Sequence, residues 1–160
     1  MTIQSLGKMT RSNWIELCGS RLAAREINNF SPLEICDVGR TAHGVELTAP
    51  PLHLLENAFK LISILQWLRE AEGSASVLIN SWYRDREYNE VIGGVPNSMH
   101  LTLGACDVTK KGKTPREVAD LLETHPQADL LGIGRYNSFT HVDCRGMMAR
   151  PSPARWGTNG

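Results

Sequence analysis

Two short segments, far apart in the chain, carry residues suited to binding a metal ion. The first is Ser98–Asp107 and the second is Phe139–Asp143. Together they supply two imidazoles and one carboxylate, from His100, His141 and Asp107. Such a set suits a hydrolytic Zn²⁺ site, because three protein ligands leave the fourth position open for a reactive water. These three residues are the candidate ligands of one metal ion.

Strand alternation supports this grouping. Side chains two residues apart on a strand share a face, so Asp107 can face His141 from a neighbouring strand. Cys106 and Cys144 then point away, which argues against thiolate ligands. His100 lies seven residues before Asp107, where the chain can turn back toward the same point. Spacing alone leaves a structural role open, since a lone histidine is more often structural than a ligand.

Composition permits this interpretation without requiring it. At 160 residues the chain is long enough for one domain with a real core. Its 17 basic and 17 acidic side chains cancel, so no broad basic field indicates a nucleic-acid partner or an anionic membrane. The four cysteines are scattered without a C-x-x-C pair, which favours small buried residues. No apolar run is long enough to insert stably in a membrane.

Periodicity predicts the elements that must position the candidate ligands. One α+β domain is expected, with flanking helices packed on a small antiparallel sheet. A helical flank over 1–29 precedes the main domain over 30–160. Apolar spacing and capping patterns predict the following elements. They are helices over 10–28, 52–72 and 86–91, a helix beginning at Thr114–Pro115, strands over 77–79, 105–108 and 139–144, an irregular crossing over 29–51, and a turn at Gly132-Ile133-Gly134.

Several motifs, in order, resemble the M15 family of zinc peptidases. The closest branch is similar to the D-alanyl-D-alanine carboxypeptidase-like enzymes of bacteria and their phages. The likeness runs from about Phe30 to Trp156. The matching positions are Ser81-Trp82-Tyr83-Arg84, Asn89, Gly93-Gly94, Asn97-Ser98-Met99-His100, Ala105, Asp107, Gly132-Ile133-Gly134-Arg135-Tyr136, Phe139, His141-Val142-Asp143 and Arg155-Trp156.

The resemblance implies one Zn²⁺ ion held by His100, Asp107 and His141, in a fold shared with the amino-terminal signalling domain of Hedgehog proteins. It also implies cleavage of a peptide bond in peptidoglycan stem peptides, by a carboxypeptidase or a cross-link endopeptidase. One position departs from the family pattern. The family usually has glycine three residues after the first histidine, where this chain has Leu103 followed by Gly104.

Further roles follow from the resemblance. Many family members carry an acidic residue three positions before the last histidine, but Ser138 stands there. Asp143 is therefore the predicted general base, with an alternative role in orienting a ligand histidine. Arg84 is predicted to meet a substrate carboxylate or an oxyanion, the alternative being a salt bridge with a neighbouring acid. Ser98 is predicted to line the pocket, or to cap the following turn.

Two alternatives concern the function as a whole. A zinc-containing module that binds the cell wall without hydrolysis would keep the same ligands, because fold does not fix function. The chain could also belong to a phage particle or lysis system. The first residues lack the apolar stretch of a signal peptide, so we expect synthesis in a cytoplasm and action in the periplasm or cell wall. The oligomeric state is left open.

Overall fold

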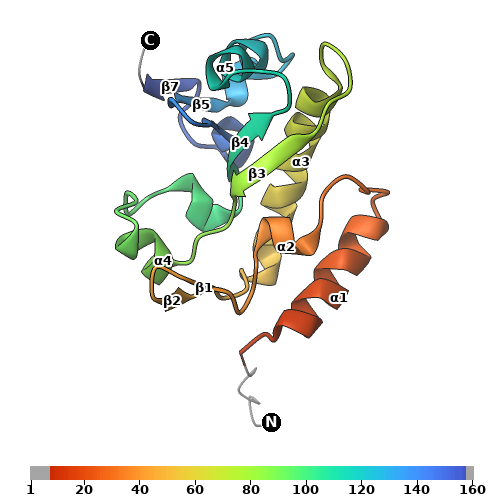
Figure 1. Ribbon diagram of the computed structural model, residues 1–160, viewed down its shortest axis with the longest axis vertical. Helices are drawn as coiled ribbons and strands as arrows, with labels where there is room; N and C mark the ends of the chain where they lie inside the picture. The colour runs from red at the N-terminus through yellow and green to blue at the C-terminus, as the bar shows by residue number, and fades with distance from the viewer. Residues whose placement is uncertain (1–7, 158–160) are drawn as a thin grey trace.

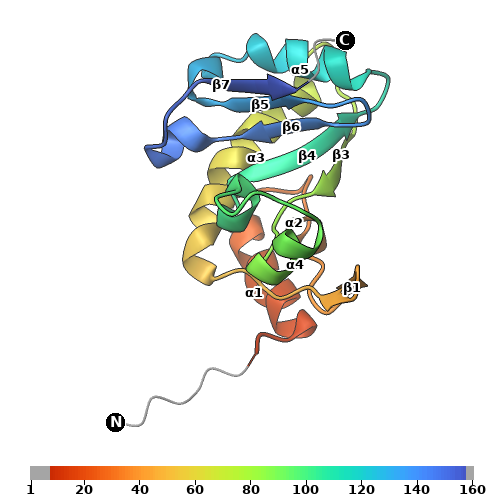
Figure 2. The same cartoon turned by 90° about the vertical axis from the view of Figure 1, so that its left-hand side faces the viewer.

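A five-stranded sheet organises the computed structural model, which describes residues 8–157. The strand order is β3-β4-β6-β5-β7, and every neighbouring pair is antiparallel except β5 and β7. Figure 2 shows the strands of the sheet one above another, with β7 uppermost. The strands are β3 (Val77–Ser81), β4 (Ala105–Lys110), β5 (Gly132–Arg135), β6 (Thr140–Asp143) and β7 (Ala154–Gly157).

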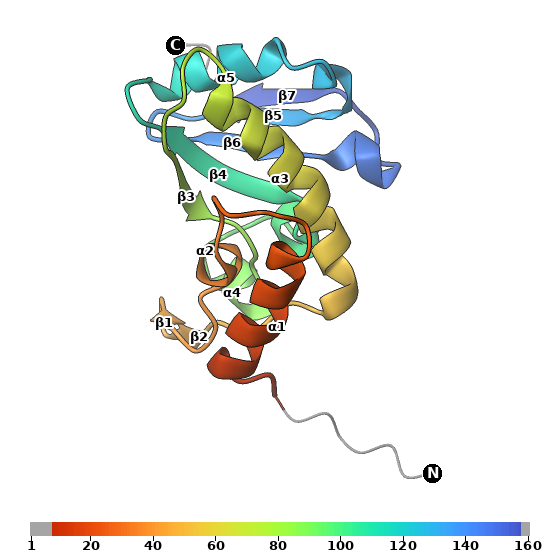
Figure 3. The ribbon, with the colours of Figure 1, turned by 90° about the vertical axis from the view of Figure 1, so that its right-hand side faces the viewer.

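Two helices, α3 (Leu55–Glu70) and α5 (Pro115–Glu123), cover one face of this sheet (Figure 3). Alternate residues of β4 and β6, such as Val108 and Val142, are fully buried in the core on that side. Thr140 on the same face of β6 donates a hydrogen bond to the Pro115 carbonyl at the start of α5. The opposite face, which carries Asp107 and His141, is therefore free to build a site.

The remaining elements lie beyond the β3 side of the sheet (Figure 1). They are α1 (Arg11–Ala23), α2 (Pro32–Ile35), a two-stranded ribbon of β1 (Thr41–Ala42) and β2 (Val45–Glu46), and α4 (Arg86–Val91). The buried side chains of α1, Trp14, Cys18 and Leu22, belong to the same hydrophobic cluster as those of α3. The proposed division at residue 30 stays a prediction, and α1 shares the core of the main domain.

Most predicted elements are confirmed, and the α+β fold class holds. The apolar stripe over 52–72 forms a short 3₁₀ turn, η1 (Leu52–Leu54), and then α3. The helix at Thr114–Pro115 begins with the predicted capping box, in which Thr114 and Glu117 exchange hydrogen bonds. The first helix ends earlier than expected, at Ala23. The crossing over 29–51 contains α2 and the β1–β2 ribbon, both too short to show periodicity.

The turn predicted at Gly132-Ile133-Gly134 is wrong, because these residues form β5, an interior strand of the sheet between β6 and β7. Neither Gly132 nor Gly134 has a positive φ, so their backbone does not demand glycine. Strand β7 was not predicted either, and its parallel pairing with β5 makes the sheet mixed. Within residues 8–157, no helix has the length and apolar character needed to cross a membrane.

Candidate metal centre

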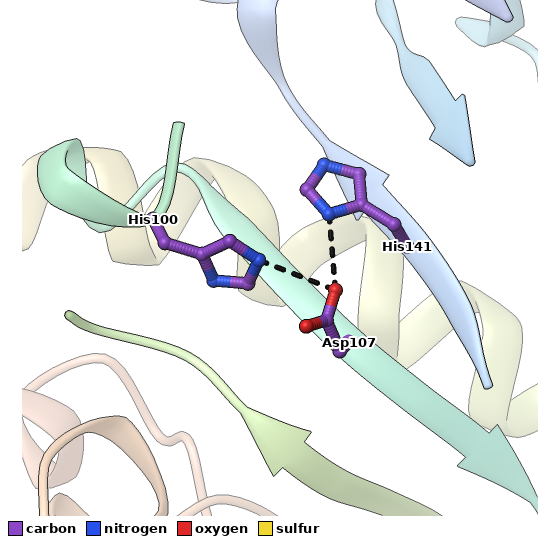
Figure 4. A group of neighbouring side chains, drawn as sticks. All are labelled: His100, Asp107 and His141. Carbon is purple, nitrogen blue, oxygen red and sulfur yellow. Dashed lines mark hydrogen bonds and ion pairs between the residues drawn. The ribbon is translucent and has the colours of Figure 1, made fainter. Parts of the chain in front are cut away.

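The three candidate ligands converge on one point of the open sheet face (Figure 4). Asp107 on β4 is paired directly with His141 on β6, and His100 approaches from the 3₁₀ helix η2 (Met99–Thr102). Asp107 Oδ1 lies 3.2 Å from His100 Nε2 and 3.0 Å from His141 Nδ1. One ligand atom from each residue lies within 4.8 Å of the others, and all three residues are buried.

The ring of His100 is fixed by the chain around it. Its Nδ1 lies 2.6 Å from the carbonyl oxygen of Trp82, which can only accept a hydrogen bond. Nδ1 therefore carries the proton, and Nε2 turns its lone pair toward Asp107 and His141. Ser98 Oγ accepts a hydrogen bond from the backbone N–H of His100 and so caps η2.

Leu103, which stands where the family usually has glycine, forms the turn between η2 and β4. It has φ +62° and ψ +2°, in the left-handed region where glycine is favoured, so the leucine adopts a conformation that suits the family's glycine. Its side chain is fully buried, and its carbonyl accepts a hydrogen bond from Trp82 Nε1 at 3.0 Å. A Cβ on Gly104 would lie 2.7 Å from Met148 Sδ, so a larger residue there requires that methionine side chain to move.

His141 is held from its other nitrogen. Nε2 lies 3.0 Å from Asp143 Oδ2, so its N–H donates to that carboxylate while Nδ1 faces Asp107. Asp143 is 0 % exposed and also accepts hydrogen bonds from the backbone N–H, Nε and Nη2 of Arg145. Arg145 therefore contacts Asp143, Asp143 contacts His141, and His141 contacts Asp107.

Proton equilibria reflect these contacts. Burial lowers the pKa of His100, so its ring is neutral at neutral pH. Burial opposes ionisation of Asp107 and Asp143. The contacts of Asp107 with the two histidines, and the hydrogen bonds that Arg145 donates to Asp143, nevertheless hold both carboxyl pKa values well below their usual range. Burial also opposes the charge on His141, yet its hydrogen bonds to the two carboxylates raise its pKa. Asp107 and Asp143 thus carry negative charge near neutral pH, and His141 can lose its proton, so the centre is suited to binding a cation.

Arg84 follows β3 and reaches the same centre. Its Nη2 donates to Asp107 Oδ2 at 2.5 Å, and its Nε donates to Ser81 Oγ at 3.0 Å. Arg84 thus pairs with a candidate metal ligand rather than with the neighbouring acids, and Asp85 instead caps α4. The oxygen bonded to Arg84 is the one turned away from the two histidines, because they contact Oδ1.

A pocket of about 810 Å³ opens over the cluster. Arg84 and Ser98 line this pocket, and their predicted roles toward a substrate stay predictions. Other lining residues were given no chemical role by the sequence. These are Val95 and neighbours on the loop after α4, Tyr136 and Phe139 between β5 and β6, and Arg145, Arg150 and Trp156 near the C-terminus. The sequence held one sign of a role for Arg145: strand alternation puts it on the same face as His141 and Asp143.

The residues present fit a divalent metal ion. Both imidazoles are tethered through one nitrogen and present the other to a shared carboxylate oxygen, which is how metal-binding histidines are oriented. Two nitrogens and one oxygen are a donor set that Zn²⁺ accepts. Cys106 and Cys144 are fully buried on the other face of the sheet, so the expected absence of thiolate donors agrees with the fold.

Comparison with known proteins agrees with this geometry. The model of one protein family, described as Peptidase M15, matches residues 28–143, well over half of the chain. The match includes His100, Asp107, His141 and Asp143, and it ends before Arg145. No curated protein matched the chain. The ordered motifs, the converging ligands and this match lead to one conclusion: the chain belongs to the M15 family of peptidases.

Proposed function

We propose that this protein is a zinc-dependent peptidase that hydrolyses a peptide bond in peptidoglycan stem peptides. The observation that carries the proposal is the convergence of His100, Asp107 and His141 beneath an open pocket. Family membership supports a peptidase, and the donor set supports zinc. The peptidoglycan substrate, and the choice between removing a terminal D-alanine and cutting a cross-link, rest on the resemblance to the carboxypeptidase-like branch.

The chain's own residues supply binding and orientation. A bound Zn²⁺ ion in such a site polarises the scissile carbonyl and makes a water molecule nucleophilic at neutral pH. Arg84 lines the pocket beside Asp107, where its guanidinium can meet an oxyanion or the terminal carboxylate of a peptide. Tyr136 and Phe139 stack with ring centroids 4.6 Å apart and provide an apolar wall for the substrate.

Asp143 has two possible roles, and its contacts favour orientation of His141. Its carboxylate is fully buried and accepts hydrogen bonds from Arg145 and from the ring of His141. A base must be free to take a proton from the reacting groups, whereas these oxygens are occupied and their pKa is depressed. We propose that Asp143 orients His141; the general-base role stays a prediction, which the second experiment below separates.

Replacing His141 with alanine tests the proposed function. The variant should lose both stoichiometric zinc and the release of D-alanine or new amino groups from purified peptidoglycan. His53→Ala is the matched control, because His53 is an exposed histidine outside the pocket. Defined muropeptides, digested and read by mass, would identify the bond. Full activity in a zinc-free His141→Ala protein would refute the proposal.

Replacing Asp143 with asparagine separates its two roles. A general base would leave zinc affinity unchanged and abolish turnover even when zinc is saturating. An orienting residue would weaken zinc binding by about 10–100-fold, with turnover recovering as zinc is added. Metal affinity and turnover therefore have to be measured on the same preparation across a zinc titration.

A module that binds zinc and cell wall without hydrolysis is the second candidate function. One observation favours it: among the described residues that line the pocket, the carboxylates are Asp107 and Asp143, and both are already engaged. Ser138, at the position of the family's usual acid, is exposed and does not line the pocket. Zinc-loaded protein that sediments with peptidoglycan but releases no products would support this candidate over the enzyme.

A further inference from the structure

Arg145 makes the most complete side-chain ion pair near the cluster, and it lies outside the family match. Its Nε donates to Asp143 Oδ1 at 2.8 Å and its Nη2 donates to Oδ2 at 2.7 Å. Its backbone N–H adds a third bond, to Oδ1 at 3.1 Å. A two-pronged contact between planar groups fixes orientation as well as distance. Asp143 therefore cannot rotate without breaking several bonds.

The sheet leaves a space for this ion pair. Gly132 on β5 is paired directly with Asp143 on β6. A Cβ on Gly132 would lie 2.4 and 2.6 Å from the two carboxylate oxygens and 2.6 Å from Arg145 Nε. Because the φ of Gly132 is not positive, space rather than backbone conformation explains this glycine. The first glycine of the G-I-G motif thus makes room for the contact between Arg145 and Asp143.

Trp156 covers the same contacts from β7. Its ring lies 5.0 Å from the guanidinium carbon of Arg145 and 5.0 Å, centroid to centroid, from the ring of His141. Its Nε1 donates to the Tyr136 hydroxyl at 3.0 Å. A Cβ on Gly134 would lie 2.7 Å from that indole nitrogen and 3.0 Å from His141 Cβ. The second glycine of the motif therefore makes room for Trp156.

We propose that Arg145 is a positioning residue of the metal centre, which acts through Asp143 to hold His141 with Nδ1 toward the metal, in a space that Gly132 provides. The inference rests on the metal site of the proposed function. Carboxylates that accept a hydrogen bond from a ligand histidine fix its ring and its tautomer, and their loss typically costs 10–100-fold in metal affinity. Here that carboxylate is itself held by Arg145.

The test compares zinc affinity in Arg145→Met with that in Arg135→Met. Arg135 is a matched control, since both arginine side chains are 23 % exposed and both form ion pairs, but Arg135 pairs with Asp120 away from the pocket. Competition with a chelator should show a Kd about 10–100-fold weaker for Arg145→Met and unchanged within about twofold for Arg135→Met. Arg145→Lys, which keeps the charge and loses the planar fork, should fall between them.

A spectroscopic readout separates positioning from general stability. With Co²⁺ in place of zinc, the visible bands report ligand geometry, and they should change in Arg145→Met and not in Arg135→Met. Gly132→Ala should reproduce the change, because its Cβ displaces the carboxylate, whereas Gly19→Ala in α1 has 3.8 Å of clearance and should not. Gly132→Ala also decides the question if Arg145→Met fails to fold.

The outcomes are distinguishable. Zinc affinity and Co²⁺ bands in Arg145→Met and Gly132→Ala that equal those of the unaltered protein would overturn this inference and leave the proposed function intact. A lower unfolding temperature with normal zinc affinity would also overturn it, since that result describes a purely structural arginine. Failure of the unaltered protein to bind zinc would instead overturn the metal site, and the inference with it.

Discussion

Leu103 occupies a backbone conformation that disfavours side chains. We therefore expect Leu103→Gly to be at least as stable as Leu103→Ala, the reverse of the order usual inside a helix. Its φ is +62°, its side chain is 0 % exposed, and it directly follows the 3₁₀ helix that carries His100. Both replacements remove the buried side chain. They differ in that alanine keeps a Cβ in the left-handed region and glycine does not.

The magnitudes can be worked out from these features. Truncating a buried leucine to alanine costs about 2–5 kcal/mol of unfolding free energy. A Cβ in the left-handed conformation costs about 1–2 kcal/mol. Glycine avoids that cost, but its greater conformational freedom stabilises the unfolded chain by about 0.4–1 kcal/mol relative to alanine. Leu103→Gly should therefore be as stable as Leu103→Ala, or more stable by up to about 1.6 kcal/mol.

Urea unfolding of the metal-free protein measures this difference. Leu65 is the matched control, because it is another fully buried leucine, in the interior of α3. There the order should be reversed, with glycine about 1 kcal/mol less stable than alanine. If alanine is clearly the more stable replacement at both positions, the left-handed backbone at Leu103 carries no cost and the reasoning fails.

Further predictions concern pH and a buried lysine. The pKa of His141 is raised by its two carboxylates against the effect of burial, so zinc must displace a proton from it. Apparent zinc affinity should therefore rise with pH, by up to about tenfold per unit, until the pKa of His141 in the folded protein is passed; chelator competition from pH 6 to 8.5 measures this, and a flat profile would contradict it. In the metal-free protein the same raised pKa stabilises the fold below the unfolded value of about 6.5, and that contribution is lost as the pH rises through the folded pKa. The lowered pKa of Asp143 works in the opposite direction: its contribution is complete above about pH 4 and is lost as the pH falls further, so Asp143→Asn should flatten the acid limb of a stability profile. Lys110, 3 % exposed, donates to the carbonyls of Leu68 and Ala71 at 2.7 Å at the end of α3, so Lys110→Met should cost about 2–4 kcal/mol in urea unfolding. Lys113→Met, which removes only an exposed ion pair with Glu72, should leave the midpoint nearly unchanged.

The sequence predicted elements whose information is local. Helix α3 followed from one apolar stripe, and α5 followed from the Thr114 capping box with proline at the first helical position. These patterns work because a helix satisfies its backbone within itself and buries one face. The interior strand β5 was missed because two of its four residues are glycines, which usually mark turns.

The candidate ligands themselves were identifiable from the sequence. Strand alternation placed Asp107 and His141 on usable faces, and the structure pairs them directly across β4 and β6. The family's ordered motifs added His100, whose approach depends on the turn at Leu103. What alternation could not supply was the direction of each ring, because that depends on acceptors elsewhere: the Trp82 carbonyl for His100 and Asp143 for His141.

Thus the sequence by itself determined the candidate ligands, their strand faces, the strongest helices and the family. Only the tertiary structure decided how the candidate ligands are held. Arg145, Gly132 and Trp156 come from three segments that meet at His141 and Asp143, and the space each needs appears only when β5, β6 and β7 are side by side. The physical reason is that close packing and hydrogen-bond direction depend on neighbours that are remote in the chain, whereas periodicity and capping depend on neighbours within one turn or strand.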